Sequence, residues 1–191
     1  RLLQISMGKG IQFRFNTVFK SITKNVDGTM LVEFMTGEPM TVDCVMFATG
    51  RVPHIAGLGL EAAGVLLENG AVKVDDDNQT NIPSIYAVGD VTNRVQLTPV
   101  AIREGQAFAD TVFGNKPTRV DYGCIPSAVF SHPPIGAVGL TESQAKQKYG
   151  SVRVYTSDFR PMKNVLAGRN ERALYKMVCD AATNRVVGLH M

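Results

Sequence analysis

Tryptophan is absent from the 191 residues, and there are only three cysteines and three histidines. Cys44, Cys124 and Cys179 lie far apart, without the Cys-x-x-Cys spacing of zinc or redox motifs, and the histidines complete no cluster of metal ligands. We therefore predict no metal site. Because Cys44 sits inside an apolar run that spans residues 42–48, we expect its thiol to be buried and unreactive.

Long apolar runs and concentrated charge are also missing. No run approaches the ~18 consecutive apolar residues of a membrane-spanning helix, and no signal peptide is visible. The 20 lysines and arginines are scattered among 17 acidic residues, for a net charge of +3, which argues against a nucleic-acid surface. We expect no membrane or nucleic-acid partner, and a cytoplasmic location.

Both ends of the chain have the pattern of internal positions in a longer protein. The first residue is Arg1 rather than methionine, and residues 186–191 form a strand-like run that stops without a turn. We therefore expect a fragment, in which any targeting segment before Arg1 would be missing.

The first half of the sequence has the pattern of an α/β protein. Alternating apolar residues and the turn signal Asp27-Gly28 predict a β-meander over residues 11–48. The meander is expected to end in a strand at 44–48 that is buried on both faces. Residues 84–88 predict a second buried strand, and a short helical piece is expected at 60–63.

A longer helix is predicted from Thr98 onward. Thr98 suits the N-cap position, and Pro99 suits the first helical position because its missing N–H is not needed there. Gly114 is expected to close the helix. The apolar face then follows the helical spacing of Ala101, Gly105, Phe108, Ala109 and Val112.

The last third is predicted to be α+β. Thr141 and Gln144 have the spacing of a capping box, which predicts a short helix that ends at Gly150. A strand-like run at residues 128–130 precedes this helix. Three further strand-like runs, which we expect to form an antiparallel sheet, follow at residues 152–155, 173–178 and 185–190. The predicted fold class is therefore α/β followed by α+β.

Residues 80–90 form the most specific local motif, Thr-x-x-x-x-Ile-Tyr-Ala-Val-Gly-Asp. A strand that ends in Gly89 and Asp90 would place them at the carboxyl edge of a parallel sheet, where ligands bind. Gly89 would let the backbone come close to a ligand, and Asp90 would accept a hydrogen bond from a sugar-like hydroxyl. A Gly-Asp pair alone favours a capped turn, whereas the longer pattern favours a ligand site.

Two further segments suit an anionic cofactor. The helix start at Gln96, Leu97 and Thr98 would present unpaired N–H groups and partial positive charge to a reduced flavin. Gly50 allows a close backbone approach, and Arg51 favours a phosphate-bearing ligand. Each segment also fits a role without a ligand, as a capped amphipathic helix and as an interdomain turn.

Together these motifs resemble the pyridine nucleotide-disulfide oxidoreductases, and among them most closely the glutathione reductases. The resemblance covers essentially all 191 residues, and the matching segments are 48–51, 85–90, 97–101, 129–136 and 138–142. It implies a flavoprotein with two dinucleotide-binding domains and a dimerisation domain. FAD and NADPH would be its cofactors, and glutathione disulfide its substrate.

The resemblance also implies roles for single residues. Asp90, after Gly89, would bind the ribityl chain of FAD, and Leu97 and Thr98 would present backbone groups to the flavin ring. Gly50 and Arg51 would lie beside NADPH and the flavin, and Gln96 and Val129 would line the nicotinamide pocket. The segment after Ile125 would form half of a homodimer interface.

Several features of the family are missing or altered. Gln106 stands where many glutathione reductases carry an arginine that helps to bind glutathione, so binding there would lack a charge-assisted hydrogen bond. His54 replaces a common asparagine. The redox Cys-x-x-x-x-Cys pair, both Gly-x-Gly-x-x-Gly fingerprints and the terminal His-Pro-x-x-x-x-Glu motif are absent. No catalytic residue is therefore expected in this chain.

The resemblance divides the chain into three incomplete domains. Residues 1–51 would end the NADPH-binding domain, 52–118 would complete the FAD-binding domain, and 119–191 would begin the dimerisation domain. We expect the chain alone to fold poorly or aggregate, because buried strands would lack neighbours. The alternatives are a trypanothione, mercuric or dihydrolipoyl reductase, or a non-catalytic flavin-binding or interaction module.

Overall fold

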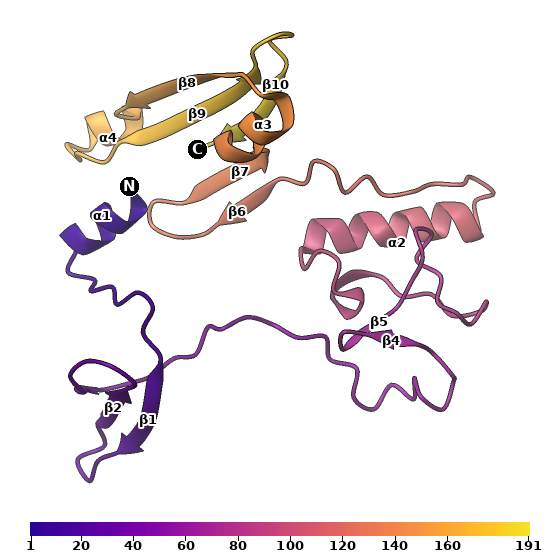
Figure 1. The fold of residues 1–191 in the computed structure, drawn as a ribbon, viewed down its shortest axis with the longest axis horizontal. Helices are drawn as coiled ribbons and strands as arrows, with labels where there is room; N and C mark the ends of the chain where they lie inside the picture. The colour runs from indigo at the N-terminus through magenta and orange to yellow at the C-terminus, as the bar shows by residue number, and fades with distance from the viewer. The chain divides into compact units, whose positions relative to one another are not determined.

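The computed structural model describes residues 1–191, which divide into two compact units (Figure 1). The first unit consists of residues 1–16 and 122–191, and the second unit of residues 17–121. None of the helices combines the length and the apolar character that crossing a membrane would require.

The second unit begins with a three-stranded antiparallel sheet in the order β1-β2-β3. Its strands are β1 (Phe19–Lys24), β2 (Met30–Phe34) and β3 (Met40–Val42). Ile22 lies opposite Val32, which is buried, and the turn between β1 and β2 contains Asp27 and Gly28. The predicted β-meander is confirmed over residues 19–42, whereas residues 11–18 form no strand.

The predicted buried strand at 44–48 is wrong. Residues 44–55 form no helix or strand, Cys44 is exposed, and the side chain of Met46 is 85% exposed. All paired strands in the structure are antiparallel, and none lies beside residues 44–48. An apolar run of this kind needs a hydrogen-bonded neighbour on each side to form a buried strand.

Two smaller predictions in the second unit are also wrong. Residues 84–88 form no strand, and only a single bridge joins Tyr86 to Gln79. The expected helical piece at 60–63 is a turn, closed by a bond from the Val65 amide to the Leu60 carbonyl. An unpredicted hairpin follows it, made of β4 (Leu67–Glu68) and β5 (Ala71–Val72).

The predicted long helix is α2 (Thr98–Val112), but its start and its buried face differ from the prediction. Leu97 is the N-cap, and Thr98 is the first helical residue, because the amide of Ala101 bonds to the Leu97 carbonyl. Its buried residues are Val100, Glu104 and Ala107, whereas Val112 is exposed. The buried face of α2 is therefore rotated about the helix axis from the predicted face, and it includes Glu104.

The first unit contains a five-stranded antiparallel sheet in the order β6-β7-β10-β9-β8. The antiparallel sheet predicted for the last third is confirmed, but β7 was not predicted. Its strands are β6 (Ser127–Val129), β7 (Ile135–Gly139), β8 (Val152–Phe159), β9 (Ala173–Asp180) and β10 (Val186–His190). The same unit contains two short helices, α1 (Leu2–Gly8) and α4 (Met162–Leu166).

The capping-box prediction is also confirmed in the first unit. Helix α3 (Glu142–Tyr149) begins after Thr141, whose hydroxyl accepts a bond from the Gln144 amide, and Gly150 is its C-cap. Ala145 on α3 is fully buried, as is Val178 on β9. Helix α3 packs against β8, β9 and β10 of the sheet.

Candidate functional site

Gly89 and Asp90 open a 3₁₀ turn, η1 (Gly89–Thr92), in the second unit. Gly89 has a φ of +75°, a conformation that strongly favours glycine. A Cβ atom added to Gly89 would lie 3.1 Å from the Cβ of Ala101 on α2. The close backbone approach predicted for Gly89 is therefore made to the protein's own helix.

A buried glutamate fixes the same turn. The amide of Gly89 donates a hydrogen bond to Oε2 of Glu104 at 2.5 Å, and the Glu104 residue is only 1% exposed. The hydroxyl of Thr92 donates to the Gly89 carbonyl at 2.8 Å. Both backbone polar groups of Gly89 are therefore held. Sequence analysis missed Glu104, although its spacing from Val100 and Ala107 was a signal.

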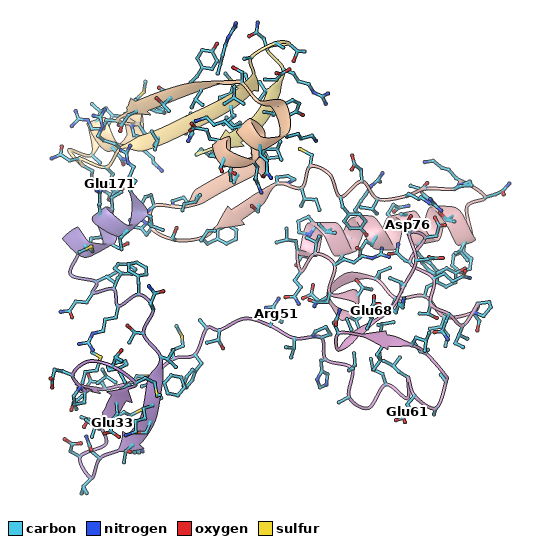
Figure 2. All side chains as sticks on the ribbon, in the orientation of Figure 1. Glu33, Arg51, Glu61, Glu68, Asp76 and Glu171 are labelled. Carbon is cyan, nitrogen blue, oxygen red and sulfur yellow. The ribbon has the colours of Figure 1, made fainter.

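Asp90 pairs with a residue from the other predicted segment. Oδ2 of Asp90 lies 3.3 Å from Nη1 of Arg51, and 43% of the Asp90 side chain remains exposed. Arg51 lies on the irregular segment between β3 and β4 (Figure 2). The structure thus brings together two residues that were predicted separately, and the Asp90 carboxylate keeps free surface for a ligand.

The start of α2 leaves the backbone N–H of Thr98 as a hydrogen-bond donor. Thr98 and Pro99 are exposed, and the first turn contains no acidic side chain. The Thr98 amide has no acceptor within the helix because it belongs to the first turn. Gln96 donates from Nε2 to Asn93 Oδ1 at 2.8 Å, next to the N-cap Leu97. The positive end of the helix dipole is therefore open to an anionic group.

The remaining predicted residues are Gly50, Gln106 and Val129. Gly50 precedes Arg51 and has a φ of +120°. Gln106 is exposed on α2, where its amide donates to Asp110 at 2.8 Å. Val129 is exposed on β6, in the other unit.

Two arginines that sequence analysis missed hold the loop before η1. Arg94 donates to the Val74 carbonyl at 3.1 Å. Arg119 donates to both carboxylate oxygens of Asp77 at 2.7 Å, which lowers the pKa of Asp77 and raises that of Arg119. The run Asp75-Asp76-Asp77 was the available signal in the sequence. These contacts support the loop and leave the α2 start free.

The donor set fits a flavin nucleotide. A partly exposed carboxylate beside a guanidinium suits the hydroxyls of a ribityl chain, and an acid-free helix start suits an electron-rich ring. No group of three or more His, Cys, Asp or Glu side chains in residues 1–191 is placed to hold a metal ion.

The sequence matches two family descriptions in succession. Residues 1–105 match the pyridine nucleotide-disulphide oxidoreductases, and residues 125–191 match the dimerisation domain of the same family.

Curated relatives agree with these matches. The chain is 50% identical over 95% of its length to the chloroplastic/mitochondrial glutathione reductase of Pisum sativum. It is 54% identical over 86% of its length to the glutathione reductase of Burkholderia cepacia, and 43% identical over 97% to the trypanothione reductase of Trypanosoma congolense. It spans 33%, 37% and 38% of these relatives, respectively, or about a third of each.

A solved structure shows the same fold. The HOCl-induced flavoprotein disulfide reductase RclA from Escherichia coli superposes with a TM-score of 0.90 at 26% identity, over 99% of this chain and 43% of RclA. The family match covers more than half of the chain. On these grounds the chain belongs to the pyridine nucleotide-disulphide oxidoreductase family.

Proposed function

We propose that this chain is part of a longer flavoprotein that reduces glutathione disulfide to glutathione with NADPH. Family membership implies a flavin and a pyridine nucleotide, and our proposal specifies FAD and NADPH. The observation that carries the proposal is the identity of 50% and 54% to two glutathione reductases over most of the chain. In the balanced reaction, NADPH and a proton reduce one disulfide bond to two thiols.

The second unit would hold the flavin. Asp90 would accept hydrogen bonds from ribityl hydroxyls, while Gly89 lets the turn lie close to α2. Leu97 and Thr98 would face the ring with the positive end of α2, which favours added negative charge. When bound, the flavin supplies electron transfer between the nucleotide and the disulfide. These residues bind and orient it, and none of them forms or breaks a bond.

The nucleotide and the substrate would use other residues. Gly50, Arg51, Gln96 and Val129 would line the NADPH region, and Gln106 would contact glutathione disulfide through neutral hydrogen bonds. The proposed reaction also requires a redox cysteine pair and an acid/base histidine, which residues 1–191 do not supply. We keep the division at 1–51, 52–118 and 119–191 as part of the proposal.

A homodimer through the segment after Ile125 completes the proposal. This segment matches the family's dimerisation domain, and it exposes large apolar side chains that are unusual on a free surface. Phe130 is 93% exposed and Leu166 is 84% exposed. Contact with a second copy would remove such side chains from water. We also propose a cytoplasmic location. The Pisum sativum relative is chloroplastic/mitochondrial, so cell fractionation would distinguish the two locations.

The test is consumption of NADPH by the full-length protein with glutathione disulfide, with NADH, trypanothione disulfide and lipoamide in parallel. We expect turnover to be fastest with NADPH and glutathione disulfide. Turnover with a different disulfide alone would contradict the substrate. A protein that binds flavin and turns over none of them would be a non-catalytic module.

Trypanothione disulfide is the second candidate substrate. The 43% identity to a trypanothione reductase and the absence of arginine at Gln106 favour keeping it in the assay. The higher identity to the two glutathione reductases places it second.

A further inference from the structure

We propose that Glu104 is a positioning residue that fixes the Gly89–Asp90 turn against α2, so that Asp90 and the α2 start act as one rigid flavin-binding unit. This inference rests on the function proposed above. It adds a residue that contacts neither the cofactor nor the substrate.

The burial of Glu104 requires an explanation. Glu104 is one of the two largest fully buried side chains in the chain, and the other is Val178. Glutamate is almost never fully buried without a partner, because its carboxylate loses hydration. Its partner at 2.5 Å is the backbone amide of Gly89. The buried carboxylate therefore binds the Gly89 backbone directly.

Two contacts on one face of α2 fix the position of the turn. Ala101 lies one helical turn before Glu104, so both point to the same side of the helix. Ala101 limits how closely Gly89 approaches, since a Cβ on Gly89 would lie 3.1 Å away, and Glu104 binds its N–H. A steric stop and a hydrogen bond together leave the turn little freedom to slide or rotate.

Because Asp90 directly follows Gly89, the contacts that fix Gly89 against α2 also fix the position of Asp90. Glu104 lies six residues beyond Thr98, which is ~9 Å along the helix axis. The contact thus ties the predicted ribityl-binding carboxylate to the predicted ring-binding helix start through one rigid element. The bond from Thr92 to the Gly89 carbonyl holds the other side of the turn.

Removal of the acceptor should separate these two parts of the site. In Glu104→Ala the Gly89 amide would be buried without a partner, and the turn would move to reach water. In Glu104→Gln an amide oxygen remains at the same reach. In Glu104→Asp the carboxyl group remains, but the acceptor is withdrawn by ~1.5 Å, about one carbon–carbon bond.

The experiment uses the full-length flavoprotein and these three variants. Glu61→Ala is the matched control, since Glu61 is exposed in a turn of the same unit. Flavin is removed, and its dissociation constant is measured by fluorescence on the refolded apoproteins. Hydrogen exchange of the peptide that covers residues 85–93 is measured without flavin. Circular dichroism confirms that each variant is folded.

We expect Glu104→Ala to bind flavin ~10-fold more weakly, as the loss of a buried hydrogen bond predicts, with faster exchange at 85–93. Glu104→Asp should change in the same direction, which keeps the test valid if the alanine variant does not fold. Glu104→Gln should stay within ~3-fold of the unmodified protein, because the acceptor is retained. Glu61→Ala should be unchanged.

Unchanged flavin affinity in Glu104→Asp and Glu104→Ala would overturn the inference, as would an equal loss in Glu104→Gln. If the unmodified full-length protein binds no flavin, the proposed function itself fails. The unmodified protein therefore separates the two failures.

Discussion

The guanidinium of Arg51 lies 3.3 Å from the carboxylate of Asp90, although 39 positions separate the two residues in the sequence. The pair joins the segment after the three-stranded sheet to the η1 turn. It is partly exposed on both sides, so its contribution to folding is small, ~0–1 kcal/mol. We propose that the pair acts instead by orienting Asp90 toward the flavin.

Substitution of this pair should affect flavin binding more than stability. We expect Asp90→Asn to weaken flavin binding by ~10-fold through the lost charge-assisted bonds. Arg51→Ala should weaken it less and leave the thermal midpoint nearly unchanged. In the double variant the Arg51 effect should disappear, because its partner is gone. Additive losses would show that Arg51 acts independently of Asp90.

Gly89→Ala should destabilise the full-length protein by more than the backbone cost alone. Gly89 and Gly70 have nearly the same φ, +75° and +76°, but an added Cβ at Gly70 meets nothing within 4 Å. Gly70→Ala should therefore cost only the left-handed conformation, ~1–2 kcal/mol. Gly89→Ala should cost a further ~1–3 kcal/mol from crowding against Ala101.

Denaturant unfolding of both glycine variants measures this difference. Ala101→Gly in the Gly89→Ala background should restore part of the loss, because it removes the crowded methyl group. Equal costs for the two single variants would show that the approach of Gly89 to α2 is not tight.

Glu142 should make the first unit sensitive to acid. Lys146 at 2.6 Å and Lys176 at 2.7 Å lower the pKa of Glu142 from 4.5 to about 2. A lowered carboxylate pKa stabilises the fold fully above 4.5, and this stabilisation is lost as the pH falls toward 2. Glu142→Gln should therefore lower the thermal midpoint of the full-length protein at pH 7 and have a smaller effect near pH ~3.

The control for this prediction is Glu68→Gln. Glu68 has one lysine partner, Lys73 at 3.2 Å, and is more exposed than Glu142. Its variant should change the thermal midpoint little at either pH. An effect of Glu142→Gln that is the same at both values would contradict the assignment.

Local signals in the sequence correctly predicted the elements that depend only on contacts between nearby residues. The Asp27-Gly28 turn, the Thr141 capping box and the α2 segment all formed because their partners lie within a few residues. The strand at 44–48 did not form because no other strand of residues 1–191 lies beside it. Cys44 is exposed for the same reason.

The candidate site was predicted in part. Asp90 and the α2 start were identified from a family-like pattern, whereas Glu104 was not, because periodicity places it on a helix without showing which backbone group it meets. The buried face of α2 depends on the hydrogen bond between Glu104 and Gly89. These two residues do not lie in the same short stretch of sequence, so local patterns do not predict the bond.

The isolated chain should self-associate. Phe130, Leu166 and Met46 are among many large apolar side chains that it exposes. We expect light scattering to show oligomers or aggregates at micromolar concentration, together with binding of a hydrophobic dye. A monomer with a sharp cooperative thermal transition would contradict this prediction.

Gln106→Arg should improve the use of glutathione disulfide. An arginine would replace a neutral amide with a charge-assisted donor, and we expect the KM for glutathione disulfide to fall by ~3- to 10-fold. The KM for NADPH serves as the internal control and should not change. A higher KM for the disulfide would show that the Asp110 carboxylate, which Gln106 now contacts, captures the new side chain.

The most direct test of the proposed reaction is its stoichiometry. The full-length protein is assayed without oxygen, and the glutathione thiols formed are counted for each NADPH oxidised. The account predicts two thiols for each NADPH and no comparable consumption with trypanothione disulfide. NADPH oxidation that yields no glutathione thiols, or thiols formed only from trypanothione disulfide, would contradict it.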